Sequence, residues 1–294
     1  MVTLLTSATT QSLALASAVG VLSGTHTAIW GMYKDAIHEG FTRRRFARSM
    51  IVGAIVAATI QLVLNLPLPS PAGLFVLFGL AYATERGIVE VWKTFVREED
   101  QSKYTIPMQL SVHGVPVNRR GVRLAAGAAY VAVVILCLVA VSHVELGPQH
   151  TPTAFRSALA WLTVGGIIAF GGAWKDAPTE GFDALKFFRS PCLTVLFALV
   201  LAPLTDSYLH VAVASIGYER ATAETYKTFL FPSKPRGKFA GKPILYPEML
   251  SRRKYFVPAY IAIWLVVIAT GAAALRGETR HAAPSDGSHA GARP

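Results

Sequence analysis

Charged residues are scarce in this sequence of 294 residues. Asp, Glu, Lys and Arg make up only 15% of it, whereas about 25% is usual in soluble globular proteins. Water-exposed surfaces need charge and lipid-facing surfaces do not, so the deficit argues against a soluble domain. The hydrophobic share of 52% and the positive mean hydropathy indicate an integral membrane protein instead.

Cysteine and the common sequence motifs of enzymes are also nearly absent. The two cysteines, Cys137 and Cys192, lie in apolar runs, so we expect buried core residues and not a disulfide or a metal site. The sequence contains no Gly-x-Gly-x-x-Gly fingerprint and no Gly-x-x-x-x-Gly-Lys-Ser/Thr loop. No basic segment precedes the first apolar run, so a cleaved signal peptide is not expected.

Long apolar runs are what the sequence does contain. A membrane-spanning helix needs about 20 mostly apolar residues. The fold class that we predict is an all-α integral membrane protein with about eight transmembrane helices, of which the third and the seventh carry charges in their second half. The candidate spans are residues 11–33, 49–67, 71–92, 122–144, 155–174, 190–206, 207–226 and 256–275.

The basic residues lie almost entirely on one side of these spans. All but four of the 28 Lys and Arg residues fall in or beside the segments 34–48, 93–123, 175–189 and 227–254. Because cytoplasmic loops of membrane proteins are enriched in Lys and Arg, these segments are predicted to be cytoplasmic and both termini non-cytoplasmic. The formal net charge of +11 then indicates a basic face beside anionic lipid headgroups and not a nucleic-acid interface.

Two sequence patterns occur twice, in the same order. The Lys-Asp-Ala motif, aromatic-Lys-Asp-Ala-x-x-Glu-Gly-Phe followed by basic-Phe-x-Arg-Ser, lies at residues 33–49 and 174–190. The Glu-Arg motif, Glu-Arg-x-x-x-Glu-x-aromatic-Lys-Thr-Phe, lies at residues 85–95 and 219–229. Four spans in each copy imply two parallel four-helix repeats, related by a pseudo-two-fold axis along the membrane normal. The predicted domains are a first repeat at 1–148, a second repeat at 149–276 and a disordered tail at 277–294.

The Lys-Asp-Ala motif places two carboxylates four residues apart, Asp35 with Glu39 and Asp176 with Glu180. Residues four apart share one face of a helix, and paired carboxylates are ligands for a hard cation such as Mg²⁺, which often also binds substrate phosphate. We therefore predict Mg²⁺ at these pairs, with phosphate held by neighbouring cations. The alternative is that the motif only anchors and ends each helix at the headgroups. The predicted phosphate-binding cations of this motif are Lys34, Arg45, Arg48, Lys175, Lys186 and Arg189.

The Glu-Arg motif carries charge into the cytoplasmic half of the third and seventh spans. Charge there is costly and usually faces the interior of the bundle. The functional interpretation is a polar cavity open to the cytoplasm, with Glu85 and Glu219 as catalytic carboxylates and the cations of the motif as ligand contacts. The structural alternative is an internal ion-pair ladder, because charges of alternating sign fall at i, i+4 and i+7. The ladder residues are Arg86, Glu90 and Lys93 in the first copy and Arg220, Glu224 and Lys227 in the second.

A basic segment at residues 232–243 is rich in Lys, Gly and Pro. It predicts an ordinary positive cytoplasmic loop, with contact to phosphate as the weaker alternative.

Three classes of function fit these features. The first is a Mg²⁺-dependent enzyme that acts on a prenyl or phospholipid phosphate at the cytoplasmic face. The second is a transporter or channel with a charged cavity open to the cytoplasm, and the third is a non-catalytic membrane scaffold subunit. The expected partners are membrane lipids and a phosphate-bearing anion, and no nucleic acid. In the enzyme, the catalytic carboxylates would be Asp35, Glu39, Glu85, Asp176, Glu180 and Glu219.

Overall fold

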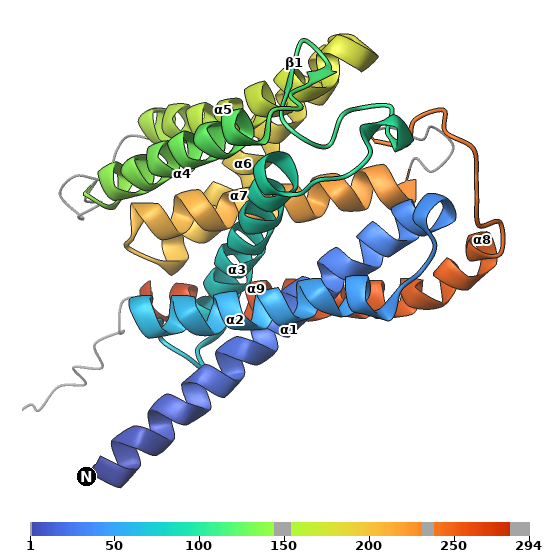
Figure 1. Ribbon diagram of the computed structural model, residues 1–294. Coiled ribbons are helices and arrows are strands. Elements are labelled where there is room, and N and C mark those ends of the chain that lie inside the picture. The colour runs from blue at the N-terminus through green and yellow to red at the C-terminus, as the bar shows by residue number, and fades with distance from the viewer. Residues whose placement is uncertain (1, 144–153, 231–237, 283–294) are drawn as a thin grey trace, which may run out of the picture.

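The computed structural model describes residues 2–143, 154–230 and 238–282, and eight long helices make up most of this part of the chain (Figure 1). The long helices are α1 (Val2–Glu39), α2 (Arg43–Leu64), α3 (Pro71–Val91), α4 (Arg120–Ser142), α5 (Ala154–Glu180), α6 (Ala184–Leu201), α7 (Tyr208–Thr225) and α9 (Val257–Ala282). The short elements are the π-helices η1 (Trp92–Val96) and η4 (Tyr226–Leu230), the 3₁₀ turns η2 (Gln101–Lys103), η3 (Ala202–Leu204) and η5 (Arg253–Phe256), the helix α8 (Met249–Arg252), and a hairpin of β1 (Ser111–Val112) and β2 (Val115–Pro116). In the hairpin the strands are antiparallel, with Ser111 opposite Pro116.

The all-helical prediction is confirmed. Six of the long helices are long and apolar enough to cross a membrane, namely α1, α2, α3, α4, α6 and α9. The sequence predicted about eight such helices. The other two, α5 and α7, form where spans were expected but are not among the six. Charge is one reason for α7, because Glu219, Arg220 and Glu224 lie within its 18 residues.

Polar residues fix the start of several helices. The Ser70 hydroxyl accepts a hydrogen bond from the Gly73 amide at the start of α3, and Pro71 fills the first helical position, where no amide donor is needed. The side chains of Asp183 and Ser207 cap α6 and α7 in the same way. These caps supply partners for backbone amides that a helix leaves unpaired in its first turn.

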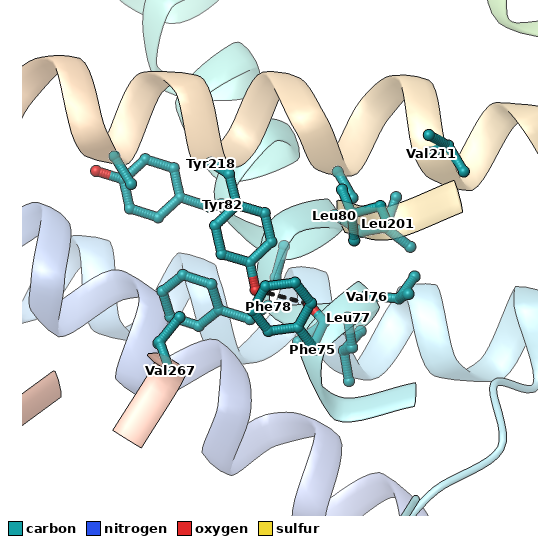
Figure 2. Close-up of a cluster of buried hydrophobic side chains, with 14 of the residues drawn as sticks. Phe75, Val76, Leu77, Phe78, Leu80, Tyr82, Leu201, Val211, Tyr218 and Val267 are labelled. Carbon is teal, nitrogen blue, oxygen red and sulfur yellow. Dashed lines mark hydrogen bonds between the residues drawn. The ribbon is translucent and has the colours of Figure 1, made fainter. Parts of the chain in front are cut away.

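The core is centred on α3 and α7, which cross in close contact. A Cβ atom on Gly217 would lie 2.0 Å from the carbonyl oxygen of Gly79, so only glycine permits this approach. Next to the crossing, the rings of Phe75 and Tyr218 stack with centroids 4.5 Å apart. The Tyr218 hydroxyl donates a 2.9 Å hydrogen bond to the Phe75 carbonyl (Figure 2). Figure 1 shows this pair between α4 and α5 on one side and α1, α2 and α9 on the other.

Helix α4 forms one outer face of the molecule. Its large apolar side chains, such as Val133, Ile135 and Leu136, are exposed. A water-soluble protein rarely exposes so continuous an apolar surface. The prediction that the cysteines are core residues is wrong: Cys137 on α4 and Cys192 on α6 are both exposed, because the outward surface of these helices is itself apolar.

The predicted boundary between the repeats, at residues 148 and 149, lies outside the described residues. The predicted tail begins at residue 277, but α9 continues to Ala282.

Candidate functional site

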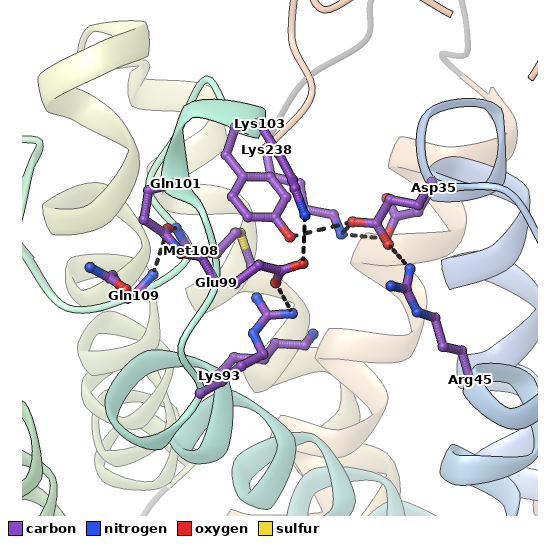
Figure 3. A network of polar contacts seen from close by, with 12 residues as sticks. Asp35, Arg45, Lys93, Glu99, Gln101, Lys103, Met108, Gln109 and Lys238 are labelled. Carbon is purple, nitrogen blue, oxygen red and sulfur yellow. Dashed lines mark hydrogen bonds and ion pairs between the residues drawn. The ribbon is translucent and has the colours of Figure 1, made fainter. Parts of the chain in front are cut away.

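The carboxylates of Asp35 and Glu39 lie at the end of α1, which stops at Gly40 because this residue has a left-handed φ of 72°. The Lys238 Nζ atom lies between them, 3.0 Å from an oxygen of each. Arg45, at the start of α2, binds the second oxygen of Glu39 at 2.7 Å. Figure 3 shows Lys238 and Arg45 reaching these carboxylates from different sides. An ammonium group therefore occupies the place predicted for Mg²⁺.

Lys238 is held by two loops that meet over this end of α1. The Thr105 amide donates to the Lys238 carbonyl at 2.7 Å, and the Thr105 hydroxyl donates to the same loop. The ring of Tyr104 lies 5.4 Å from the ammonium, and its hydroxyl lies 3.4 Å from Glu39. Burial lowers the pKa of Lys238, but the carboxylates of Asp35 and Glu39 raise it by more than burial lowers it. The resulting pKa is well above the usual range. Lys238 is therefore charged near neutral pH and neutralises the pair.

Glu99, in the loop that also carries Tyr104 and Thr105, forms ion pairs as well. Its carboxylate lies 2.6 Å from Arg97 and 3.6 Å from Lys103. Burial raises the pKa of Glu99, but a hydrogen bond from Tyr104 and the charges of Arg97 and Lys103 lower it, and the net pKa is below its usual value. Burial raises the pKa of Tyr104 to about 12. Arg97, Glu99, Lys103 and Lys238 thus form a cap of paired charges over the end of α1.

The second Lys-Asp-Ala motif has the same helix end but a different lysine. Helix α5 ends before Gly181, whose φ is 77°. Lys186, on α6, lies 2.7 Å from Asp176 and 2.8 Å from Glu180. Lys186 stands where the first motif has Arg45, so this pair obtains its ammonium from within its own motif, whereas the first pair obtains it from a distant loop.

Lysine side chains stand at both positions predicted for Mg²⁺. Each carboxylate pair is already bridged by one ammonium group, so Mg²⁺ would have to displace a lysine. In the part of the chain that the structure describes, no three His, Cys, Asp or Glu residues are grouped as a metal site.

The ion-pair ladders predicted for the Glu-Arg motifs are confirmed. In the first motif, Glu90 lies 3.3 Å from Arg86 and 3.4 Å from Lys93. In the second, the equivalent Glu224 is bound by the equivalent cations at 3.1 and 3.6 Å. Since each glutamate lies between two cations of its own helix, the ladder neutralises most of the charge that these helices carry.

The lysine of the first Lys-Asp-Ala motif points away from its own carboxylates. Lys34 lies 3.9 Å from Glu224 of the second Glu-Arg motif. This ion pair therefore joins the first half of the chain to the ladder of the second half.

The remaining carboxylates of these motifs, Glu85 and Glu219, are fully buried. Glu219 accepts a 2.6 Å hydrogen bond from the Ser190 hydroxyl. Glu85 has the Arg86 guanidinium at 3.7 Å, but neither of its oxygens has a hydrogen-bond partner among the described residues. Ser49 occupies the position that Ser190 has in the second motif, but it makes no equivalent bond.

Arg48 and Arg189, the arginines of the two Lys-Asp-Ala motifs, each stand over an aromatic ring. Arg48 lies 5.7 Å from the ring centre of Trp92, and Arg189 lies 5.7 Å from that of Tyr226. Both rings begin a π-helix, η1 and η4 respectively. A cation–π contact of this kind contributes about 0.5–1 kcal/mol at an exposed site.

A cavity of about 330 Å³ lies between α1, the start of α2, and η1, within the size range of small-molecule sites. Its inner wall is one face of α1 from Thr27 to Glu39, and Trp30, Met32 and Phe46 give it an apolar part. Four carboxylates also line it, those of Asp35, Glu39, Glu98 and Glu99, and its six cations are Arg45, Arg48, Arg86, Lys93, Arg97 and Lys238.

The structure thus gathers only part of the predicted site. Asp35 and Glu39 line the cavity together with four of the predicted cations. Lys34 lies instead beside Glu224. The predicted residues of the second copy, from Asp176 to Lys227, do not line this cavity, so the two motifs do not share one site.

The charged and aromatic residues of the site that were not predicted include Trp92, Arg97, Glu98, Glu99, Tyr104 and Lys238. Trp92 belongs to the Glu-Arg motif as its aromatic position, and Lys238 belongs to the basic segment 232–243, so both had a weak signal. Arg97 and Tyr104 had none, because nothing in the sequence shows which cytoplasmic loop folds over α1.

Comparisons with known proteins reveal no relatives. No family model matches the chain, and neither the curated proteins nor the solved structures include a match. The cavity beside α1 is therefore the feature that bears on function.

Proposed function

We propose that this chain is an integral membrane protein that binds a prenyl or phospholipid phosphate in the cavity beside α1, at its cytoplasmic face, and acts on it there. The observation that carries the proposal is the composition of the cavity lining. Six cations line it together with apolar side chains of α1 and α2, and four carboxylates line it as well. Arginine and lysine are the usual phosphate ligands, and the apolar part fits a hydrocarbon.

Membrane insertion is supported by the six apolar helices and by the exposed apolar face of α4. The sidedness follows from the basic residues, since the loops that carry Arg97, Lys103, Lys238 and Lys242 lie at the end of the molecule where α1 ends and α2 begins. By the positive-inside rule this end faces the cytoplasm, and both termini lie on the other side.

The two-repeat arrangement is supported by contacts that occur twice. Each half has a glycine-terminated helix with a lysine-bridged carboxylate pair, an arginine over an aromatic ring, and an ion-pair ladder. In a parallel repeat these features lie at the same depth of the membrane.

The residues of the cavity have distinct parts in this proposal. The cations hold the phosphate oxygens and neutralise charge that develops on them. Asp35 and Glu39 are the carboxylates close enough to exchange protons with a bound ligand. Mg²⁺ is a separate part of the hypothesis: it supplies a Lewis acid at the phosphate when bound, and it requires Lys238 to leave the carboxylate pair.

The test is ligand-dependent thermal stability of the detergent-purified chain. A ligand that binds only the folded state raises the melting temperature, so phosphatidic acid and a prenyl phosphate are expected to raise it, whereas phosphatidylcholine and the free prenol are not. Arg45→Gln is expected to reduce the shift. Arg44→Gln is the matched control, because Arg44 is adjacent and exposed but does not line the cavity.

The same protein tests the enzyme reaction. Release or transfer of phosphate from these lipids is measured with and without Mg²⁺, in the wild type and in Asp35→Asn. Turnover that requires Mg²⁺ and Asp35 supports the enzyme. Binding without turnover supports a transporter instead, and the absence of a stability shift with every phosphate-bearing lipid contradicts the proposal.

The scaffold alternative is favoured by one observation, the confirmed ion-pair ladders. If the ladders are the main purpose of the charges, Glu90→Gln lowers the melting temperature and no phosphate-bearing lipid raises it.

A further inference from the structure

The cytoplasmic side of the cavity is only partly covered by paired charges. This inference rests on the proposed function and asks how the ligand reaches the cavity. The side chains of Lys238, Glu99 and Arg97 line this side and are 14, 17 and 19% exposed, and each forms an ion pair at 3.0 Å or less. Phe41 and Glu98 also line the cavity and are 39 and 59% exposed, so the rim has exposed residues here as well.

Exposed residues also border the cavity on its side, between α2 and η1. The Arg45 side chain is 54% exposed and Trp92 is 41% exposed. Arg48, which contacts Trp92 across this opening, is exposed as well. The opening therefore lies between α2 and η1, and the cation–π contact of Arg48 with Trp92 joins its two edges.

Both edges of the opening continue into apolar surface. On α2, Ile51 and Ile55 are exposed and follow Arg48 at i+3 and i+7, so they share its face. On the other edge, Ile88 and Val96 are exposed four residues before and after Trp92. Exposed apolar stripes on candidate spans face lipid, and the side opening therefore faces the membrane.

Arg48 is the cation of this cavity that has no carboxylate partner. Within residues 2–143, 154–230 and 238–282, the other five cavity cations each form an ion pair, and Arg48 forms none. Its guanidinium stands over the ring of Trp92, 5.7 Å from the ring centre. An arginine with free donors is suited to bind phosphate through two parallel hydrogen bonds.

The depth of the cavity matches a lipid. Its wall on α1 extends over thirteen residues, from Glu39 to Thr27, and the twelve steps between them span about 18 Å of helix. Lys34 marks the level at which α1 leaves the hydrocarbon, so the Thr27 end lies about 10 Å inside it. A ligand with its phosphate at Arg48 can place the first part of its hydrocarbon chain beside Met32 and Trp30.

We propose that the ligand is a phosphate monoester lipid that enters sideways from the cytoplasmic leaflet between α2 and η1, with Arg48 as its phosphate anchor. The Arg48–Trp92 contact is then the gate, since it opens when the guanidinium turns from the ring to the phosphate.

Photocrosslinking in nanodiscs tests this route. The probes are phosphatidic acid and phosphatidylcholine that carry the same diazirine near the start of one acyl chain. We expect phosphatidic acid to label Met32 and Trp30 on the cavity wall, and phosphatidylcholine to label only outward residues such as Ile51 and Ile55. Arg48→Gln should reduce the cavity labelling roughly tenfold, the effect of losing one charge-assisted hydrogen bond. Arg189→Gln, the equivalent change in the second motif, should not.

The outcomes separate this inference from the proposed function. Excess inorganic phosphate and glycerol phosphate are added as soluble competitors. If they stabilise the protein and displace the lipid label fully, phosphate binding stands and lateral entry is wrong. Equal labelling of Met32 by both lipids also overturns the inference, because the phosphate is then not recognised. If neither lipid nor soluble phosphate binds, both proposals fall. Melting temperatures and Arg48→Lys, which keeps the charge, show whether Arg48→Gln is folded.

Discussion

A serine hydroxyl distinguishes the two buried glutamates of the Glu-Arg motifs. Ser190 donates to Glu219, whereas Glu85 has no such donor among the described residues. We expect Ser190→Ala to destabilise the protein by about 1–3 kcal/mol, because it leaves a buried carboxylate without its hydrogen bond. The melting temperature of the purified protein measures the effect. Ser49→Ala is the control at the equivalent position, and an equal loss there would contradict the explanation.

Glu99 makes the cap sensitive to acid. Its pKa is lowered in the folded protein by Tyr104, Arg97 and Lys103. A lowered folded pKa means that the stabilisation is complete above the unfolded value of about 4.3 and is lost as the pH falls through the folded pKa. We expect the melting temperature of the wild type to decrease as the pH is lowered below about 4.3, and that of Glu99→Gln to decrease less. Identical acid profiles for the two proteins would show that Glu99 does not contribute.

At the scale of helices, the close crossing of α3 and α7 depends on glycine. A methyl group on Gly217 would clash with backbone of α3, and overpacking of this kind costs about 1–3 kcal/mol. We therefore expect Gly217→Ala to lower the melting temperature clearly. Gly87→Ala is the matched control, because its Cβ would meet nothing within 4 Å and alanine favours the helix by up to about 1 kcal/mol. Similar losses for both would exclude the crossing as the cause.

The helices were the part of the fold that the sequence predicted well. The predicted span 71–92 compares with α3 at Pro71–Val91, and 207–226 compares with α7 at Tyr208–Thr225. The end of α1 was missed by six residues, since a helix continues beyond the hydrocarbon when its next residues, here Lys34 to Glu39, favour it. Apolar length reports where lipid lies and not where a helix stops.

The site was predictable only where its residues share a helix. The spacing of Asp35 and Glu39, and that of the ladder charges, follows from helical periodicity. The partner of the first carboxylate pair does not, because Lys238 is about 200 residues away in the chain and its loop is placed by backbone bonds to Thr105. Periodicity carries no information about such long-range contacts, so the lysine at the predicted metal position was not foreseen.

For the whole molecule, the sidedness can be measured directly. In a chain with Cys137 and Cys192 replaced by alanine, Ser102→Cys and Gly277→Cys each introduce one thiol at opposite ends of the molecule. We expect a membrane-impermeant maleimide added to intact cells to label Gly277→Cys but not Ser102→Cys, because both termini are proposed to lie outside. Permeabilised cells are the control, in which both should react. The reverse labelling would invert the proposed topology and place the cavity on the other face.

The Lys34–Glu224 ion pair between the halves has a consequence for synthesis. Glu224 leaves the ribosome 190 residues after Lys34, and at 5–20 residues per second this is about 10–40 s. During that interval Lys34 lacks this partner, and we expect a first half that stays unpaired to be degraded by quality-control proteases. A separately expressed fragment 1–148 should therefore be short-lived, and co-expression with 149–294 should rescue it. The pairing that ties the two halves together would then also act as the checkpoint of assembly.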